Sequence, residues 1–178
     1  MAARKIELRR LYDETAEIYD RRYAEIQKAK YRLVLENLPE NVGRILDLGC
    51  GTGLLLDDLS KRGDLVVGID ASEKMLGAAK ARRAKAELVL ADADHLPFKD
   101  ASFDCVVSVT LLQNIPEPAV CVGEAARVLK KGGLAVFTTL KRKNSLDEVK
   151  KWMESAGLKV ARLEEIPESE DILCVAWM

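Results

Sequence analysis

Short apolar runs alternate with stretches whose apolar residues recur at helical spacing along most of this chain. The runs have the length and composition of buried strands, and the stretches between them have the period of helices. The pattern predicts strands at about residues 44–48, 65–70, 87–91, 105–109, 134–140, 159–164 and 171–177. It predicts helices at about residues 53–62, 73–83, 117–129 and 145–155, and two helices over residues 4–37 with a break near Tyr19.

Strands that alternate with helices indicate a mainly parallel sheet with helices on both faces. The last two strands are separated only by residues 165–170, which is too short for a helical crossover, so we expect them to be antiparallel to each other. The fold prediction is a three-layer α/β protein. We expect one domain over residues 1–178, with an N-terminal helical cap at 1–40 and the core at 41–178.

The most informative segment lies at the end of the first predicted strand. The strand ends at Asp47, three glycines follow at alternate positions (Gly49, Gly51 and Gly53), and a helical pattern begins directly after them. Glycine allows positive φ and close approach of a ligand, and the first turn of a helix presents unpaired N–H groups. The spacing differs from the dinucleotide fingerprint, and the phosphate-loop lysine is absent. Asp70 ends the next strand roughly 20 residues further on, where a carboxylate binds ribose hydroxyls.

These motifs, with Ala91-Asp92-Ala93 and residues 103–108, occur in the order found in the class I S-adenosylmethionine-dependent methyltransferases. The chain resembles that family, and its methyltransferase type 11 group, over about residues 40–140. The resemblance implies a Rossmann-like seven-stranded mixed sheet with an antiparallel last strand. It also implies an enzyme that uses S-adenosylmethionine as its cofactor.

The resemblance further implies a set of cofactor-binding residues. By this resemblance, Asp47 organises the glycine turn near the methionine end of the cofactor. Asp70 accepts hydrogen bonds from the ribose. Asp92 accepts from the adenine amino group, with Asp94 as the alternative. The full set is Tyr19, Asp47, Gly49, Cys50, Gly51, Gly53, Asp70, Ala71, Met75, Asp92 and Ala93. Tyr19 belongs to a tyrosine-aspartate motif that closes over the cofactor in this family.

Candidates for the acceptor side follow the strand at 105–109, at the edge where open α/β sheets bind ligands. Gln113 and Asn114 are the substrate-side candidates, and a structural role as a helix cap explains them equally well. His95 is the one histidine and has a side chain suited to a general base. Methyl transfer is an in-line displacement that depends on alignment, so we do not expect His95 to be catalytic.

Composition limits the remaining possibilities. The four cysteines, Cys50, Cys105, Cys121 and Cys174, are far apart and lie in or beside apolar segments, so we expect buried, reduced thiols. With one histidine and no metal-ligand spacing, we expect no metal site. No apolar run approaches the ~18 residues of a membrane span, and the first residues are charged, so we expect a cytoplasmic protein with no membrane partner.

The sequence is compatible with several methyl acceptors. The short connection between the strand ending near residue 140 and the helix beginning near residue 145 leaves no room for a lid. An open site favours an RNA or protein substrate, and the basic run at 141–143 lies beside it, although the net charge of −1 argues against RNA. The alternatives are a small-molecule methyltransferase of quinone or metabolite pathways and a non-catalytic cofactor-binding partner subunit. A dehydrogenase does not fit the glycine spacing or Asp47.

The strand at 87–91 predicts a protein partner. In the strand order of the resembling family it lies at the sheet edge, and it contains no proline or lysine that would block pairing. An apolar edge accepts a strand from another chain. We therefore expect a partner subunit or a homodimer through residues 87–91.

Overall fold

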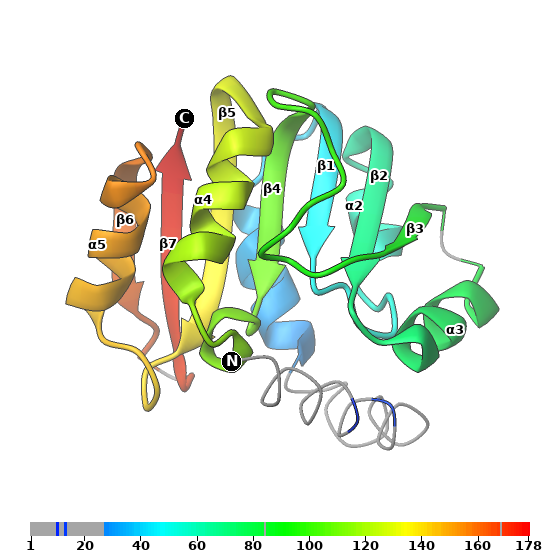
Figure 1. Ribbon diagram of the computed structural model, residues 1–178, viewed down its shortest axis with the longest axis horizontal. Helices are drawn as coiled ribbons and strands as arrows, with labels where there is room; N and C mark the ends of the chain where they lie inside the picture. The colour runs from blue at the N-terminus through cyan, green and yellow to red at the C-terminus, as the bar shows by residue number, and fades with distance from the viewer. Residues whose placement is uncertain (1–9, 11–12, 14–26, 84, 168) are drawn as a thin grey trace.

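The computed structural model describes residues 10, 13, 27–83, 85–167 and 169–178. Within them, seven strands form one sheet in the order β3-β2-β1-β4-β5-β7-β6 (Figure 1). The first five strands pair in parallel, and β7 runs antiparallel to both β5 and β6. The predicted mixed sheet is therefore confirmed. The strands are β1 (Val42–Leu48), β2 (Gly63–Asp70), β3 (Glu87–Leu90), β4 (Phe103–Val109), β5 (Leu129–Leu140), β6 (Lys159–Glu165) and β7 (Asp171–Trp177).

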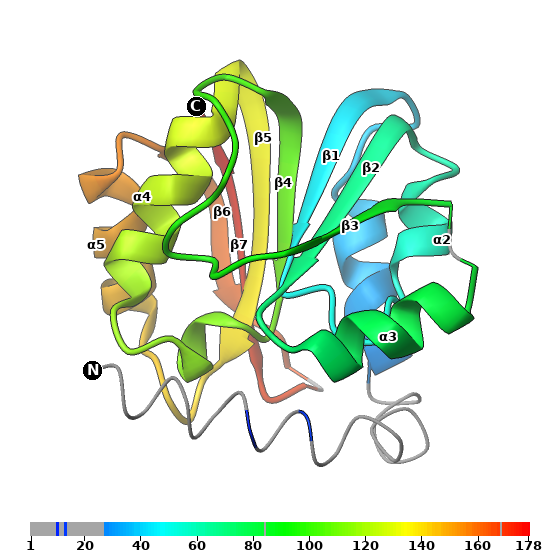
Figure 2. The same cartoon turned by 45° about the vertical axis from the view of Figure 1, so that its right-hand side comes forward.

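Helices cover both faces of the sheet. The helices are α2 (Leu56–Leu59), α3 (Glu73–Ala81), α4 (Pro118–Val128) and α5 (Leu146–Ser155), with a 3-10 turn η1 (Leu112–Asn114). Residues 27–36 are also helical, as are residues 10 and 13. Helices α4 and α5 lie on one face, and helix 27–36 and α2 lie on the other (Figures 1 and 2).

The central strands are buried on both faces, which explains their almost continuous apolar runs. In β4, Val106 packs into the core cluster beneath α4 and α5, whereas Cys105 and Val107 pack into the cluster beneath helix 27–36. This alternation follows the two-residue period of a strand. All four cysteines are buried and none forms a disulfide, as the sequence predicted.

Two local predictions are wrong. The helix expected at 53–62 is reduced to α2, because residues 51–55 are occupied by the glycine turn, in which Gly53 N–H donates to Cys50 O at 3.0 Å. The strand expected at 134–140 begins earlier, at Leu129, and has an irregularity near its start. Pairing passes from Phe103↔Leu129 to Cys105↔Leu134, so the extra residues are absorbed in β5, where Gly132 has φ of +77°.

Serine side chains cap the first turns of two helices. Ser72 accepts a hydrogen bond from Met75 N–H at 3.1 Å and begins α3. Ser145 and Glu148 form the capping box of α5.

A buried ion pair connects helix 27–36 to the sheet. Lys30 Nζ lies 3.1 Å from Asp171 Oδ1, and the two side chains are only 9% and 1% exposed. Asp171 is the first residue of β7, so the pair fixes the helix near the edge at which the parallel strands end. Across the part of the chain that the structure describes, no helix has the length and apolarity that a membrane span requires.

Candidate active site

A cavity opens at the carboxyl ends of β1, β2, β3 and β4, where the strand order reverses between β1 and β4. Open α/β sheets bind ligands at this point. The cavity holds about 890 Å³ of empty space, part of it open to solvent. The predicted cofactor residues that line it are Gly49, Gly51, Asp70, Ala71, Met75, Asp92 and Ala93.

A second, smaller cavity adjoins the first beneath helix 27–36. Asp47 and Cys50 line it, together with Gln27 and Tyr31 of that helix. The two cavities share Gly49, Gly51 and Val109. Sequence reasoning missed Gln27 and Tyr31, because no local signal shows that a helix 20 residues upstream of the glycine turn folds back over it.

The three glycines of the turn have left-handed φ values of +73°, +55° and +78°. A Cβ at Gly49 would lie 2.9 Å from Leu111 Cδ1, and a Cβ at Gly53 would lie 2.9 Å from Ala79 Cβ. A Cβ at Gly51 would meet no atom within 4 Å. Gly49 and Gly53 therefore allow Leu111 and Ala79 to pack closely against the turn. Gly51, in contrast, faces open space and lines both cavities. Gly53 is the predicted residue of the turn that lines neither cavity.

Asp70 fastens this turn to the end of β2. Its Oδ2 accepts from Gly51 N–H at 3.0 Å, and its Oδ1 accepts from Ser72 N–H at 2.9 Å. Burial raises the pKa of Asp70, and the N–H groups of Ser72, Gly51 and Ala71 oppose that shift. A carboxylate has about four lone-pair sites, more than these N–H donors use, so Asp70 keeps acceptor capacity.

Asp47 is buried at the end of β1 and lines the second cavity. Burial, and to a smaller extent the charge of Asp70, raises the pKa of Asp47 to about 7. A cation placed in this cavity would lower that pKa, because an opposite charge favours the ionised form.

The segment after β3 brings both candidate adenine acceptors to the first cavity, since Asp92 and Asp94 both line it. Asp94 is buried, and its Oδ1 lies 3.2 Å from His95 Nδ1. The His95 side chain is 81% exposed and lines neither cavity.

The two acceptor-side candidates differ in their surroundings. Asn114 lines the first cavity. Gln113 does not: its Nε2 donates to Thr110 O, and its Oε1 lies 3.1 Å from the Thr139 hydroxyl. These contacts give Gln113 a structural role in η1.

Thr110 is a cavity residue that the sequence reasoning missed. It lines the first cavity and has φ of +52°, which is unusual for a β-branched residue. Its N–H donates to Thr138 O at 2.9 Å, and its carbonyl accepts from the Gln113 amide. Such backbone strain persists where the surroundings enforce it, and it is concentrated at functional sites. A polar residue directly after a buried strand was the available signal.

The predicted Tyr19 lies outside the described residues. Asp13, which is described, accepts a hydrogen bond from the Ser72 hydroxyl at 2.5 Å. Ser72 lines the first cavity, so the N-terminal part of the chain contacts the site.

Residues 46–137 match the family described as "Methyltransferase domain". The chain belongs to this methyltransferase family. The match includes the glycine turn, Asp70 and the segment at 91–94, all of which line the cavities, whereas Gln27 and Tyr31 of the second cavity lie before the matched residues. The cofactor of this family is S-adenosylmethionine.

Curated relatives of this methyltransferase domain act on different acceptors, according to their names. The chain is 38% identical over 104 residues to a ubiquinone biosynthesis O-methyltransferase of Alkalilimnicola ehrlichii, covering 56% of this chain and 42% of that protein. It is 37% identical over 153 residues to a malonyl-acyl-carrier-protein O-methyltransferase of Marinomonas, covering 83% of this chain and 56% of the relative. The chain thus spans about half the length of these relatives.

Solved structures confirm the fold. A putative methyltransferase in complex with the Haloferax volcanii activator Trm112 superposes with a TM-score of 0.80 at 22% identity, covering 93% of this chain and 95% of that one. A methyltransferase from Mesorhizobium loti gives a TM-score of 0.76 at 21% identity, covering 84% of this chain and 98% of that one.

Proposed function

We propose that this chain is an enzyme that binds S-adenosylmethionine across the two joined cavities and transfers its methyl group to an acceptor at the open sheet edge. The observation that carries the proposal is Gly51. Its N–H is fixed by Asp70, and the position of its missing Cβ is open space where the two cavities meet. This arrangement allows a ligand to pass close to the backbone from one cavity to the other.

The first cavity suits an adenosine group. Asp70 keeps acceptor capacity for two ribose hydroxyls at the end of β2. Met75 and Ala71 supply apolar contacts for a base. Asp92 supplies an acceptor for the adenine amino group, and Ala93 N–H supplies a donor for a ring nitrogen.

The second cavity suits the amino acid end of the cofactor. Asp47 is a buried carboxylate whose raised pKa signals a site that favours a positive charge or a proton. An α-ammonium group satisfies this requirement. The same carboxylate lies at the glycine turn, so it also orients the ligand relative to Gly49 and Gly51.

When bound, S-adenosylmethionine supplies a methyl group on a sulfonium sulfur. The protein aligns the acceptor with that methyl group, because the acceptor must attack the methyl carbon from the side opposite the sulfur. The residues after β4 that we assign to the acceptor side of the first cavity are Val109, Thr110, Leu111 and Asn114. The enforced backbone of Thr110 fixes the position of this wall.

We propose that the acceptor is a large molecule, an RNA or a protein. Only residues 141–145 separate β5 from α5, and only residues 166–170 separate β6 from β7, so neither connection forms a lid over the site. Lys141, Arg142 and Lys143 are exposed on the first of these connections, where they would meet an anionic polymer. A small-molecule acceptor is the second candidate, and the names of the quinone and acyl-carrier relatives favour it.

A labelling experiment tests the activity and separates these acceptors. The protein is incubated with tritiated S-adenosylmethionine and native cell extract, and the products are split into nuclease-sensitive, protease-sensitive and solvent-extractable fractions. We expect label in a macromolecular fraction, and much less label with Asp70→Ala at the same cofactor concentration. Label in the extractable fraction would support the second candidate. No labelling in any fraction, together with no cofactor binding by calorimetry, would refute the proposal.

We also propose that β3 docks a partner subunit or a second copy of the chain. β3 is an edge strand that pairs only with β2, and Leu90 at its end is 49% exposed. Ala91 N–H donates to Asp70 O of β2, so by alternation the N–H groups of Leu88 and Leu90 face outward. The similar structure that contains an activator supports a partner for this fold.

The docking test uses a lysine on the edge, which is a natural block to strand pairing. Leu90→Lys should weaken self-association or capture of a subunit, measured by light scattering and by co-purification from native extract. The matched control is Val120→Lys on α4, which is 42% exposed and lies away from β3. A wild-type protein that is monomeric, co-purifies with nothing and is fully active alone would contradict the proposal.

A further inference from the structure

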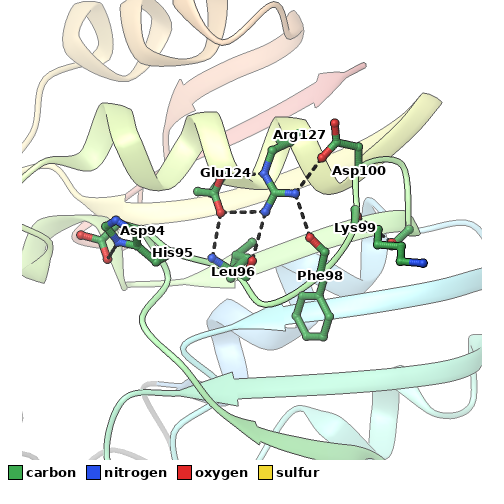
Figure 3. A network of polar contacts seen from close by, with 9 residues as sticks. Asp94, His95, Leu96, Phe98, Lys99, Asp100, Glu124 and Arg127 are labelled. Carbon is green, nitrogen blue, oxygen red and sulfur yellow. Dashed lines mark hydrogen bonds and ion pairs between the residues drawn. The ribbon is translucent and has the colours of Figure 1, made fainter.

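The segment that joins β3 to β4 is held against α4 by two side chains, Arg127 and Glu124 (Figure 3). Arg127 Nη2 donates to Leu96 O at 3.1 Å, and its Nη1 donates to Phe98 O and to Asp100 Oδ1, both at 2.8 Å. Glu124 Oε2 accepts from Leu96 N–H at 2.8 Å. Both backbone groups of Leu96 are thereby fixed by the same pair.

The pair is itself bidentate. Arg127 Nε lies 2.6 Å from Glu124 Oε1, and Arg127 Nη2 lies 2.8 Å from Glu124 Oε2. The ion pair lowers the pKa of the Glu124 carboxyl, so this residue stays ionised. The planar guanidinium presents donors in fixed directions, and a lysine ammonium does not reproduce this geometry.

The other end of the same segment is also fixed. Ala91 N–H donates to Asp70 O at 3.1 Å, which ties the start of the segment to the end of β2. Between Ala91 and Leu96 lie the residues that face the first cavity, Asp92, Ala93 and Asp94. Neither Arg127 nor Glu124 lines that cavity, so both act on it only through the backbone that they hold.

We propose that Arg127, together with Glu124, is a positioning residue that sets residues 92–94 in the conformation that recognises the base of the cofactor. The inference depends on the proposed function, which places the adenine in the first cavity. Recognition of a base edge requires donors and acceptors at fixed positions, and small displacements of the supporting segment reduce it strongly. The α4 residues thus determine which base the site prefers.

The experiment compares two ligands that differ only at the base. S-adenosylhomocysteine carries the exocyclic amino group, and S-inosylhomocysteine carries an oxygen there. Calorimetry should show that the wild-type protein prefers the adenosyl ligand, and that Arg127→Lys brings the affinity ratio of the two ligands toward one. Asp92→Ala should lose the same preference, and the double variant should lose no more than either single variant.

Two controls separate positioning from general damage. Arg162→Lys makes the same change at another arginine that holds a carboxylate, Glu164 on β6, and should keep the wild-type ratio. Amide hydrogen exchange of the ligand-free protein should show the Leu96 amide exchanging about tenfold faster in Arg127→Lys. The reason is that Glu124, which accepts from Leu96 N–H, is then held less firmly. If Arg127→Lys does not fold, Glu124→Gln keeps the shape of its side chain and tests the same contact.

Each outcome decides the inference. An equal loss of affinity for both ligands in Arg127→Lys, or an unchanged ratio, would show that the pair is only structural. A wild-type protein without base preference would also overturn the inference, while leaving the cofactor site intact. A wild-type protein that binds neither ligand would refute the proposed function itself.

Discussion

Replacing Gly51 by alanine separates the stability of the glycine turn from its capacity to bind a ligand. Gly51 has φ of +55°, and a Cβ built on it meets no atom within 4 Å. Gly51→Ala therefore introduces backbone strain without a clash in the ligand-free protein. With a ligand that passes between the cavities, the same methyl group occupies the space of the ligand.

The two effects have different sizes. A left-handed alanine costs about 1–2 kcal/mol, partly offset by the lower entropy of the unfolded chain, so we expect a net loss of about 1 kcal/mol. For a chain of this size that loss lowers Tm by about 2–4 °C. Forcing an extra methyl group into a filled site costs about 1–3 kcal/mol, which weakens cofactor binding by roughly 10- to 100-fold.

The matched control is Gly132→Ala. Gly132 also has a positive φ, of +77°, and a Cβ there also meets no atom within 4 Å, but it lies near the start of β5 and lines neither cavity. Both variants should lose similar stability in thermal denaturation. Only Gly51→Ala should lose affinity for S-adenosylhomocysteine in calorimetry. Equal affinities in the two variants would refute the assignment of Gly51 to the ligand path.

Four further results are expected. Asp70→Ala should weaken S-adenosylhomocysteine binding about 10- to 100-fold in calorimetry, since two N–H groups and the ribose lose their acceptor; unchanged affinity would contradict the ribose assignment. Because the pKa of Asp47 is raised from 3.8 to about 7, the folded protein holds a proton that the unfolded chain releases. The free energy of unfolding should then fall as the pH rises from about 4 to about 7, and denaturant titrations of Asp47→Asn should show a flatter profile. Lys30→Ala removes the cation paired with the buried Asp171 carboxylate, leaves that carboxylate the hydrogen bond from the Ser169 hydroxyl, and should cost about 3–5 kcal/mol in urea denaturation; a loss below 1 kcal/mol would show that water replaces the lysine. His95→Ala should keep most methyltransferase activity, whereas a loss of ~10²–10⁴-fold with intact cofactor binding would reveal a general base.

Local patterns in the sequence determined the sheet and the centre of the site. Apolar runs identify the strands because parallel strands are buried on both faces. Asp47 and Asp70 end neighbouring parallel strands, whose carboxyl ends meet at one edge, so their approach to the glycine turn followed from the sequence alone. The reduced thiols were predicted from the spacing of the cysteines and their apolar surroundings, whereas the edge position of β3 came from the strand order of the resembling family.

Only the tertiary structure decided which neighbouring side chains face the cavities. Gln113 and Asn114 are adjacent and chemically alike, and both side-chain amides donate to Thr110 O, yet Gln113 also contacts the Thr139 hydroxyl while Asn114 lines the first cavity. The short α2 and the irregular start of β5 depend on pairing between distant segments in the same way.

Only the tertiary structure identified the residues that support the site from distant parts of the sequence. Tyr31 reaches the second cavity from a helix that precedes β1, and Arg127 fixes Leu96 from 31 positions further along the chain. Periodicity and propensity report on contacts within a few residues, where the spacing along the chain fixes the spacing in space. Contacts across long loops depend on how whole elements pack, and no local pattern in the sequence encodes them.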